Sequence, residues 1–84
     1  MSRHFLERAK ETHKIHVANL RNNDNWSIEK TAKSLSRSKG SVSEDLMIIR
    51  WYRIHEKKIE SFHTASDCLE WIRDKSKEDE MEDV

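Results

Sequence analysis

The chain has 84 residues, of which 35% are hydrophobic and 38% are charged. A chain of this length buries only about 60% of the surface that its unfolded form exposes, so its small core leaves no room for a large substrate pocket, and we expect no enzyme. The formal net charge is zero, but residues 1–73 carry +4 and residues 74–84 carry −4, so a mildly basic body precedes an acidic end.

The apolar residues recur at helical spacing in a chain with no proline and one glycine, which predicts an all-α fold. The first helix is predicted over residues 2–21. Its apolar stripe consists of Leu6, Ala9, His13, Val17 and Leu20. Asparagine and aspartate residues between Arg21 and Asn25 favour a turn and end this helix.

Two further helices are predicted on either side of a short break. The second covers residues 27–35, because the Ser27 hydroxyl can accept a hydrogen bond from a free N–H group of the first turn. The third covers residues 39–58, with Ser38 as its cap. The segment Leu46–Ile54 is apolar nearly all round, so this helix must bury more than one face.

The fourth helix is predicted over residues 64–75, where Thr64 and Asp67 resemble a capping box. From residue 76 onward little apolar side chain is left to bury, and we expect residues 76–84 to form a disordered acidic tail. The expected architecture is therefore a single small four-helix domain, residues 1–75, followed by that tail.

The stretch from Thr31 to Leu46 carries the most functional information. A short helix, a break of three or four residues and a second helix form a helix-turn-helix arrangement. The order Ala–x–x–Leu–x–x–Ser–x–x–x–Val–Ser–x–x–Leu, residues 32–46, resembles the helix-turn-helix of ParB-type partition proteins and of many phage and plasmid repressors. The resemblance covers residues 27–47 only.

Two residues depart from the pattern of that family. Ser36 occupies the first turn position, where the family usually has a glycine in the left-handed conformation, and a non-glycine residue there costs about 1 kcal/mol. Asp45 stands where the family often has an apolar residue. Either Leu46 alone holds the second helix of the motif on the core, or that helix is slightly rotated.

The resemblance implies that the second helix of the motif reads DNA in the major groove. Its outward residues would be Ser38, Lys39, Gly40, Ser43, Glu44 and Met47. Lys39 and Ser43 suit base edges or phosphates, whereas Glu44 is tolerated mainly where it accepts a hydrogen bond from cytosine N4. Phosphate contacts are expected from Lys30, Lys33 and Arg37.

We therefore expect a sequence-specific double-stranded DNA-binding protein, a small transcription regulator of phage or plasmid type that is cytoplasmic and nucleoid-associated. Surplus apolar residues near the end of the third helix and in the fourth predict a homodimer. Its interface would use Ile48, Trp51, Tyr52, Leu69 and Ile72. Two alternatives stay open: a protein-interaction module whose Met47–Ile54 face modulates a host protein, and a DNA partition or packaging subunit.

Other kinds of site are not predicted. His13 and His16 lack the further ligands that zinc requires, so we expect no metal. No nucleophile–base pair stands out and one glycine cannot build a phosphate loop, so we expect neither catalytic residues nor a cofactor. With one cysteine, Cys68, no signal-peptide stretch and no apolar run near the roughly 18 residues of a membrane span, we expect a soluble intracellular protein without a membrane partner.

Overall fold

The computed structural model describes residues 4–82, with side chains up to residue 78, and this part of the chain is all-helical, as predicted. Its helices are α1 (Phe5–Asn22), α2 (Ile28–Ser34), α3 (Lys39–Tyr52), α4 (Glu56–Glu60) and α5 (Ala65–Glu82). The prediction of four helices is wrong for this part of the chain, because the predicted third helix is divided into α3 and α4.

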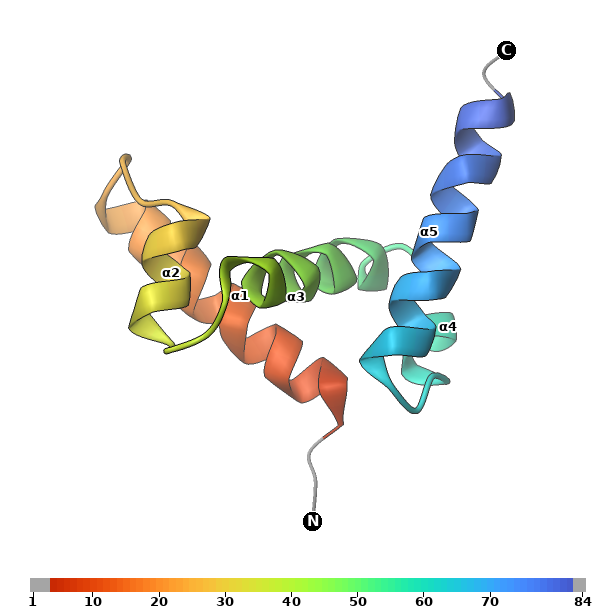
Figure 1. Ribbon diagram of the computed structural model, residues 1–84, viewed down its shortest axis with the longest axis horizontal. Coiled ribbons are helices and arrows are strands. Elements are labelled where there is room, and N and C mark those ends of the chain that lie inside the picture. The colour runs from red at the N-terminus through yellow and green to blue at the C-terminus, as the bar shows by residue number, and fades with distance from the viewer. Residues whose placement is uncertain (1–3, 83–84) are drawn as a thin grey trace.

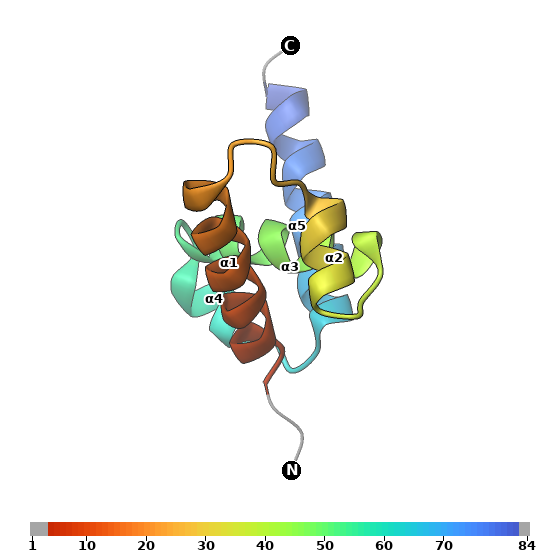
Figure 2. The ribbon, with the colours of Figure 1, turned by 90° about the vertical axis from the view of Figure 1, so that its left-hand side faces the viewer.

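The central helix, α3, contacts each of the other four helices. α1 runs across α3, α2 lies beside the first turns of α3, and α4 and α5 pack near its last turns (Figure 1). Figure 2 shows the same arrangement from the side, with the second half of α5 projecting beyond all the other helices. The molecule measures 39 × 38 × 20 Å along its principal axes.

The first helix, α1, begins at Phe5, because His4 caps it: the His4 Nδ1 atom accepts a hydrogen bond from the Leu6 N–H group at 3.2 Å. Residues 2 and 3 of the predicted helix lie outside the described residues. The buried residues of α1 are Phe5, Leu6, Ala9 and Thr12. The predicted stripe is therefore correct only in the first two turns, and Leu20 at the far end is 37% exposed. Thr12 replaces His13 on the buried side because its hydroxyl has partners on α3.

α3 begins at the predicted residue, Lys39, and α2 begins at Ile28, one residue after its predicted start. The hydroxyls of Ser27 and Ser38 cap α2 and α3 by accepting hydrogen bonds from first-turn N–H groups at 3.3 and 3.1 Å. Ala32 is 4% exposed, so its small side chain lets α2 approach its neighbours closely. Ser36 has φ 55°, the left-handed conformation expected at that turn position.

The predicted third helix ends six residues early, at Tyr52. The N–H groups of Ile54 and His55 both bond to the Trp51 carbonyl oxygen, at 3.1 and 2.8 Å, and this turn precedes α4. The turn leaves Ile54 74% exposed, whereas Ile59 on α4 is fully buried. Periodicity could not reveal the break, because the segment before it is apolar on nearly every side.

The last helix, α5, is capped by Thr64, whose hydroxyl accepts a hydrogen bond from the Asp67 N–H group at 3.2 Å, as the capping box predicted. It extends to Glu82, seven residues beyond the predicted end. The disordered acidic tail is therefore not confirmed for residues 76–82, whose backbone is helical. Residues 83 and 84 of that prediction lie outside the described residues.

The main core lies where α1, α3, α4 and α5 meet. It consists of Phe5, Leu6, Ala9, Ile48, Ile49, Ile59, Cys68 and Ile72. Trp51 and Trp71 pack against it, ring edge to ring face, with centroids 6.0 Å apart. Burial raises the pKa of the Cys68 thiol to about 11. Among the helices of residues 4–82, none is long and apolar enough to cross a bilayer.

Candidate functional site

An exposed polar stripe runs along the first turns of α3. It consists of Lys39, Gly40, Ser43, Glu44 and Met47, all of which the sequence predicted to face outward, and Met47 is 44% exposed. Gly40, Ser43, Glu44 and Met47 follow the three- and four-residue spacing of one helix face. A methyl group added at Gly40 would meet no atom within 4 Å, so the surface there is open.

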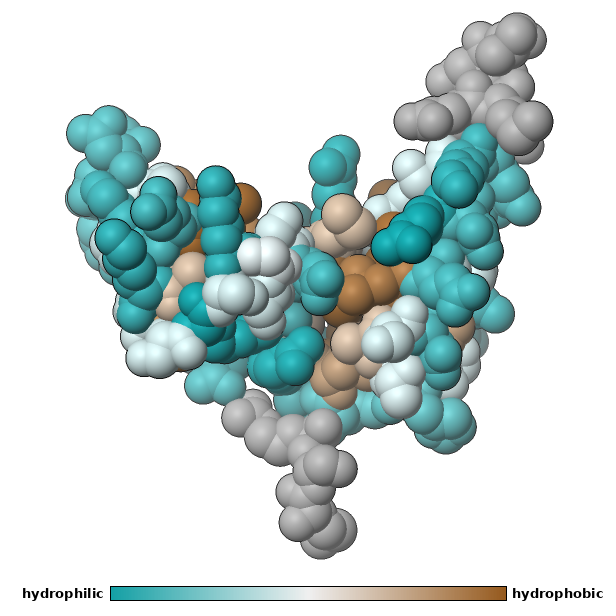
Figure 3. Space-filling view, viewed as in Figure 1, coloured by the Kyte–Doolittle hydropathy of each residue, from teal (hydrophilic) through white to brown (hydrophobic). Residues whose placement is uncertain are grey.

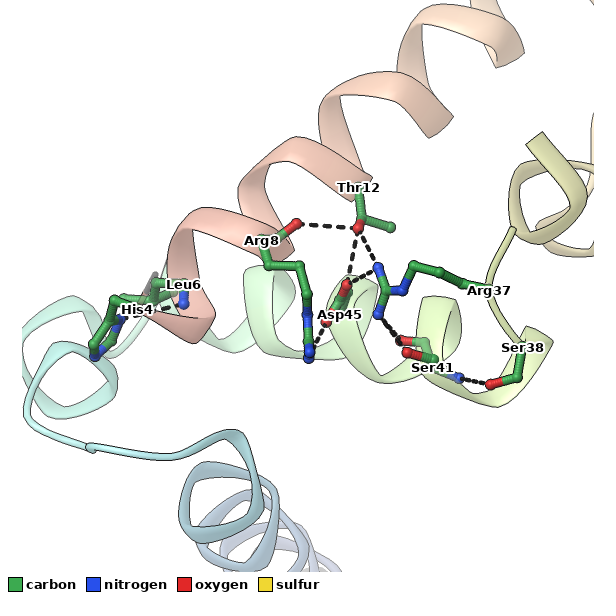
Figure 4. Close-up of polar contacts among 8 residues, drawn as sticks. All are labelled: His4, Leu6, Arg8, Thr12, Arg37, Ser38, Ser41 and Asp45. Carbon is green, nitrogen blue, oxygen red and sulfur yellow. Dashed lines mark hydrogen bonds and ion pairs between the residues drawn. The ribbon is translucent and has the colours of Figure 1, made fainter. Parts of the chain in front are cut away.

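Asp45 lies on the opposite, inward side of α3 and is fully buried. Arg8 of α1 reaches its Oδ1 atom at 3.1 Å, and Arg37 of the turn reaches its Oδ2 atom at 2.6 Å. The Thr12 hydroxyl donates a hydrogen bond to Oδ2 at 2.8 Å and accepts one from Arg37 at 2.8 Å. Arg37 also bonds to Ser41 (Figure 4). We call Arg8, Thr12, Arg37, Ser41 and Asp45 the Asp45 cluster.

The Asp45 cluster decides the question that the sequence left open at this position. Asp45 itself faces inward, while Leu46 beside it is only half-buried. The inward position therefore holds a carboxylate that residues of two other segments, α1 and the turn, neutralise or bond. The cluster joins α1, the turn and α3, so it sets the rotation of α3 about its own axis and thereby the direction in which the polar stripe points.

Arg37 has a different role in the cluster from the one that the sequence predicted. The sequence predicted a phosphate contact, but the Arg37 side chain is 20% exposed and its guanidinium already binds Asp45, Thr12 and Ser41. Ser38 is exposed, yet its hydroxyl caps α3. These two predicted contact residues therefore have structural roles that leave them little freedom for a ligand.

The two predicted phosphate-binding lysines of α2, Lys30 and Lys33, are both exposed. The Lys33 ammonium lies 3.9 Å from a Glu29 carboxylate oxygen, and both side chains are mostly exposed, so this pair is weak and can open. The Lys30 ammonium donates a long hydrogen bond, 3.4 Å, to the Asn25 carbonyl oxygen. Both lysines thus keep their charge at the surface.

A second candidate site is the groove between α3 and α5, which we call the α3–α5 groove. Its apolar lining consists of Leu46, Met47, Trp51, Ile54, Leu69 and Ile72. Arg50, Arg73 and Lys77 line it too, together with Ser43 and Glu44 of the polar stripe. Figure 3 shows hydrophobic surface at the bottom of the hollow beside α5, with hydrophilic side chains next to it.

The predicted dimer residues divide into two groups. Ile48 and Ile72 are 0% and 2% exposed, so the single chain already buries them and they offer little surface to a partner. Trp51, Tyr52 and Leu69 are half-buried. The exposed part of the apolar surplus lies at Met47 and Ile54, which both line the α3–α5 groove.

Three further polar interactions shape the surroundings of these surfaces. The fully buried Thr31 hydroxyl accepts a hydrogen bond from the Trp26 indole at 2.7 Å and lies 2.7 Å from His16 Nδ1. A hydrogen bond from the Tyr52 hydroxyl to Glu60, at 2.7 Å, raises the Tyr52 pKa to about 12.

Among the described residues no group of His, Cys, Asp and Glu side chains could hold a metal ion.

Sequence reasoning missed the Asp45 cluster and the basic side of the groove. The cluster joins residues up to 37 positions apart, so no local pattern signals it. The basic side of the groove has only a weak signature in the sequence: Arg73 and Lys77, together with Leu69 and Ile72, follow a three- and four-residue spacing on α5.

Comparison of the chain with protein families, with curated proteins and with solved structures finds no match.

Proposed function

We propose that this chain is a sequence-specific double-stranded DNA-binding protein in which α2, the turn and α3 act as a helix-turn-helix. The observation that carries the proposal is the polar stripe on the first turns of α3, which is exposed and directed by the Asp45 cluster. A role as a small transcription regulator of phage or plasmid type rests on the resemblance over residues 27–47.

The chemistry of the stripe suits the major groove. Lys39 can donate to guanine O6 and N7, Ser43 can donate or accept, and Glu44 can accept from cytosine N4. Met47 can contact a thymine methyl group. Gly40 lets the helix backbone come close to a base edge or a phosphate. Phosphate contacts that position the protein would come from the exposed lysines of α2, Lys30 and Lys33.

The test is selection of bound duplexes from a random DNA library at physiological salt. Enrichment of a short motif is the expected result, and an inverted repeat with half-sites about one helical turn apart would add a two-fold dimer. Binding without enrichment would favour a partition or packaging subunit instead. If no duplex is retained, the DNA proposal fails.

Two variants separate DNA contact from folding. Lys39→Ala should weaken binding of the selected duplex about tenfold, while Lys14→Ala on the exposed side of α1 is the matched control and should change it little. Gly40→Ala should raise helix stability by up to about 1 kcal/mol yet weaken DNA binding, because the added methyl group occupies the open surface. Equal DNA affinity in all three variants would contradict the proposed contact face.

One observation favours a second candidate function, a protein-interaction module. The α3–α5 groove presents exposed apolar side chains on the Met47–Ile54 face, and exposed apolar patches mark protein contacts. If the chain is such a module, the Lys39 and Gly40 substitutions should leave its binding of the partner protein unchanged. Substitution of Ile54 by a charged residue should abolish that binding.

A further inference from the structure

The α3–α5 groove has the chemistry of a docking site for an acidic helix. Met47 and Ile54 line it and are 44% and 74% exposed, although they are large apolar side chains. Arg50, Arg73 and Lys77 are exposed beside them and have no ion-pair partner among the described residues. An apolar floor with an unpaired basic rim fits a helix that presents both apolar and acidic side chains.

The chain itself contains such a segment at its C-terminal end. Residues 78–84 carry five carboxylate side chains and no basic residue, and Met81 and Val84 are three positions apart. This segment belongs to the same chain that supplies the basic rim, so charge complementarity is available without a foreign protein.

The acidic segment continues α5 beyond Lys77, the last residue that lines the groove, and as far as Glu82 it does not fold back over the apolar floor of its own chain. α5 is one continuous helix as far as Glu82, and its second half leads away from the body of the molecule (Figure 1). At 1.5 Å per residue, Glu82 lies roughly 20 Å along the helix axis from Leu69 on the apolar floor and about 8 Å beyond Lys77 on the rim. While α5 is helical, Glu82 therefore lies away from the apolar floor of its own groove and is available to another molecule.

A symmetric contact of one groove with the other is disfavoured by charge. In a two-fold dimer each surface meets its own copy, so Arg50, Arg73 and Lys77 would face the same three cations. Exchange of the acidic ends avoids this repulsion. If two α5 helices run antiparallel and cross between Lys75 and Ser76, Arg73 of one copy lies opposite Glu78 of the other, and Lys77 lies opposite Asp74.

We propose that the α3–α5 groove binds the acidic C-terminal segment, residues 78–84, of a second copy of this chain, so that two copies exchange the ends of α5 reciprocally. The exchange gives the projecting half of α5 tertiary contacts, which a short polar helix needs in water. The proposal goes beyond DNA binding and does not depend on it.

The test uses two charge-reversed full-length chains and sedimentation velocity without DNA. One chain carries Arg50→Glu, Arg73→Glu and Lys77→Glu, and the other carries Asp74→Lys, Glu78→Lys, Glu80→Lys and Glu82→Lys. The unchanged chain should form dimers, and each reversed chain alone should dissociate at least about tenfold more readily, since several ion pairs become repulsive. An equimolar mixture should restore the dimer, because both exchanged contacts are then complementary.

Controls keep the outcome unambiguous. All substituted positions with described side chains are exposed, and the helical content of each chain is checked by circular dichroism. A chain that ends at Lys77 should also be monomeric. The proposal is overturned if the unchanged chain is monomeric up to about 1 mM, if truncation leaves the dimer intact, or if the mixture of reversed chains does not associate. None of these readings depends on whether the chain binds DNA.

Discussion

The two halves of α3 are held in the molecule by different chemistry. In the first half, Val42 is buried as well, but Asp45 adds directional bonds to Arg8, Thr12 and Arg37. In the second half, Ile48 and Ile49 are packed in an apolar core with no bond that fixes direction.

The difference corresponds to what each half presents to solvent. Hydrogen bonds and ion pairs fix an angle, and above the Asp45 cluster α3 exposes a polar stripe with a defined direction. Apolar packing depends on the buried area and has no preferred direction, and beside it Met47 of α3 and Ile54 of the turn after α3 stay exposed at the α3–α5 groove. One helix thus offers a polar surface suited to specific reading and an apolar surface suited to association.

The largest expected effect comes from removing the buried carboxylate. Asp45→Ala should lower the free energy of unfolding by about 3 kcal/mol, because it leaves the mostly buried Arg37 guanidinium without its counter-ion. Urea denaturation followed by circular dichroism measures this. Glu44→Ala, at the exposed neighbouring carboxylate, is the control and should stay within about 0.5 kcal/mol.

A double replacement sharpens the comparison. Asp45→Leu combined with Arg37→Met should recover most of the lost stability, since well-packed apolar residues often replace a buried ion pair without loss.

For the single substitution, a loss below about 1 kcal/mol in Asp45→Ala would mean that the cluster is effectively solvated and does not hold α3.

In the apolar region, Ile59→Ala should cost about 2–4 kcal/mol, because Ile59 is the buried side chain that α4 contributes to the core. In the Ile59→Ala variant, amide hydrogen exchange should be faster in α4 than in α1, because α4 has lost its buried side chain. Ile54→Ala makes the same chemical change at a 74% exposed position and should cost less than about 0.5 kcal/mol. Equal losses at the two positions would contradict the turn between α3 and α4.

At the turn that precedes the Asp45 cluster, Ser36→Gly should stabilise the protein by about 0.5–1 kcal/mol. Glycine removes the side-chain cost of φ 55° but adds conformational entropy to the unfolded chain, so the gain is smaller than the strain itself. The midpoint of thermal unfolding should rise accordingly. Ser34→Gly, at the last residue of α2, is the matched control and should not raise it.

The smallest expected effect is a pH dependence at the contact between α1 and the end of α3. Partial burial, and then the charges of Arg53 and His16, lower the His13 pKa in the folded protein from its usual 6.5. The unfolded chain therefore binds the proton first, and stability is full above pH 6.5 and falls as the pH drops through that value. His13→Gln should flatten this part of the stability curve, whereas His63→Gln, at an exposed position, should leave its slope in place.

Several features of the fold were predictable from sequence because they depend on residues close together in the chain. Ser27, Ser38 and Thr64 cap helices through bonds that span three positions. The buried Ala32 follows from the spacing of the two helices, whereas the left-handed Ser36 was expected from the resemblance over residues 27–47. The exposed members of the polar stripe follow from the helix period alone. The function read from that stripe stays a prediction.

Tertiary structure decided what local patterns could not. The partners of Asp45 lie 8 to 37 positions away, so only the folded chain reveals that Arg37 is turned inward. The break after Tyr52 depends on where Ile59 finds the core, and α5 continues beyond its last buried residue, where the sequence predicted disorder. Caps and periods belong to single helices, whereas the burial of a charge and the formation of a groove depend on how helices meet.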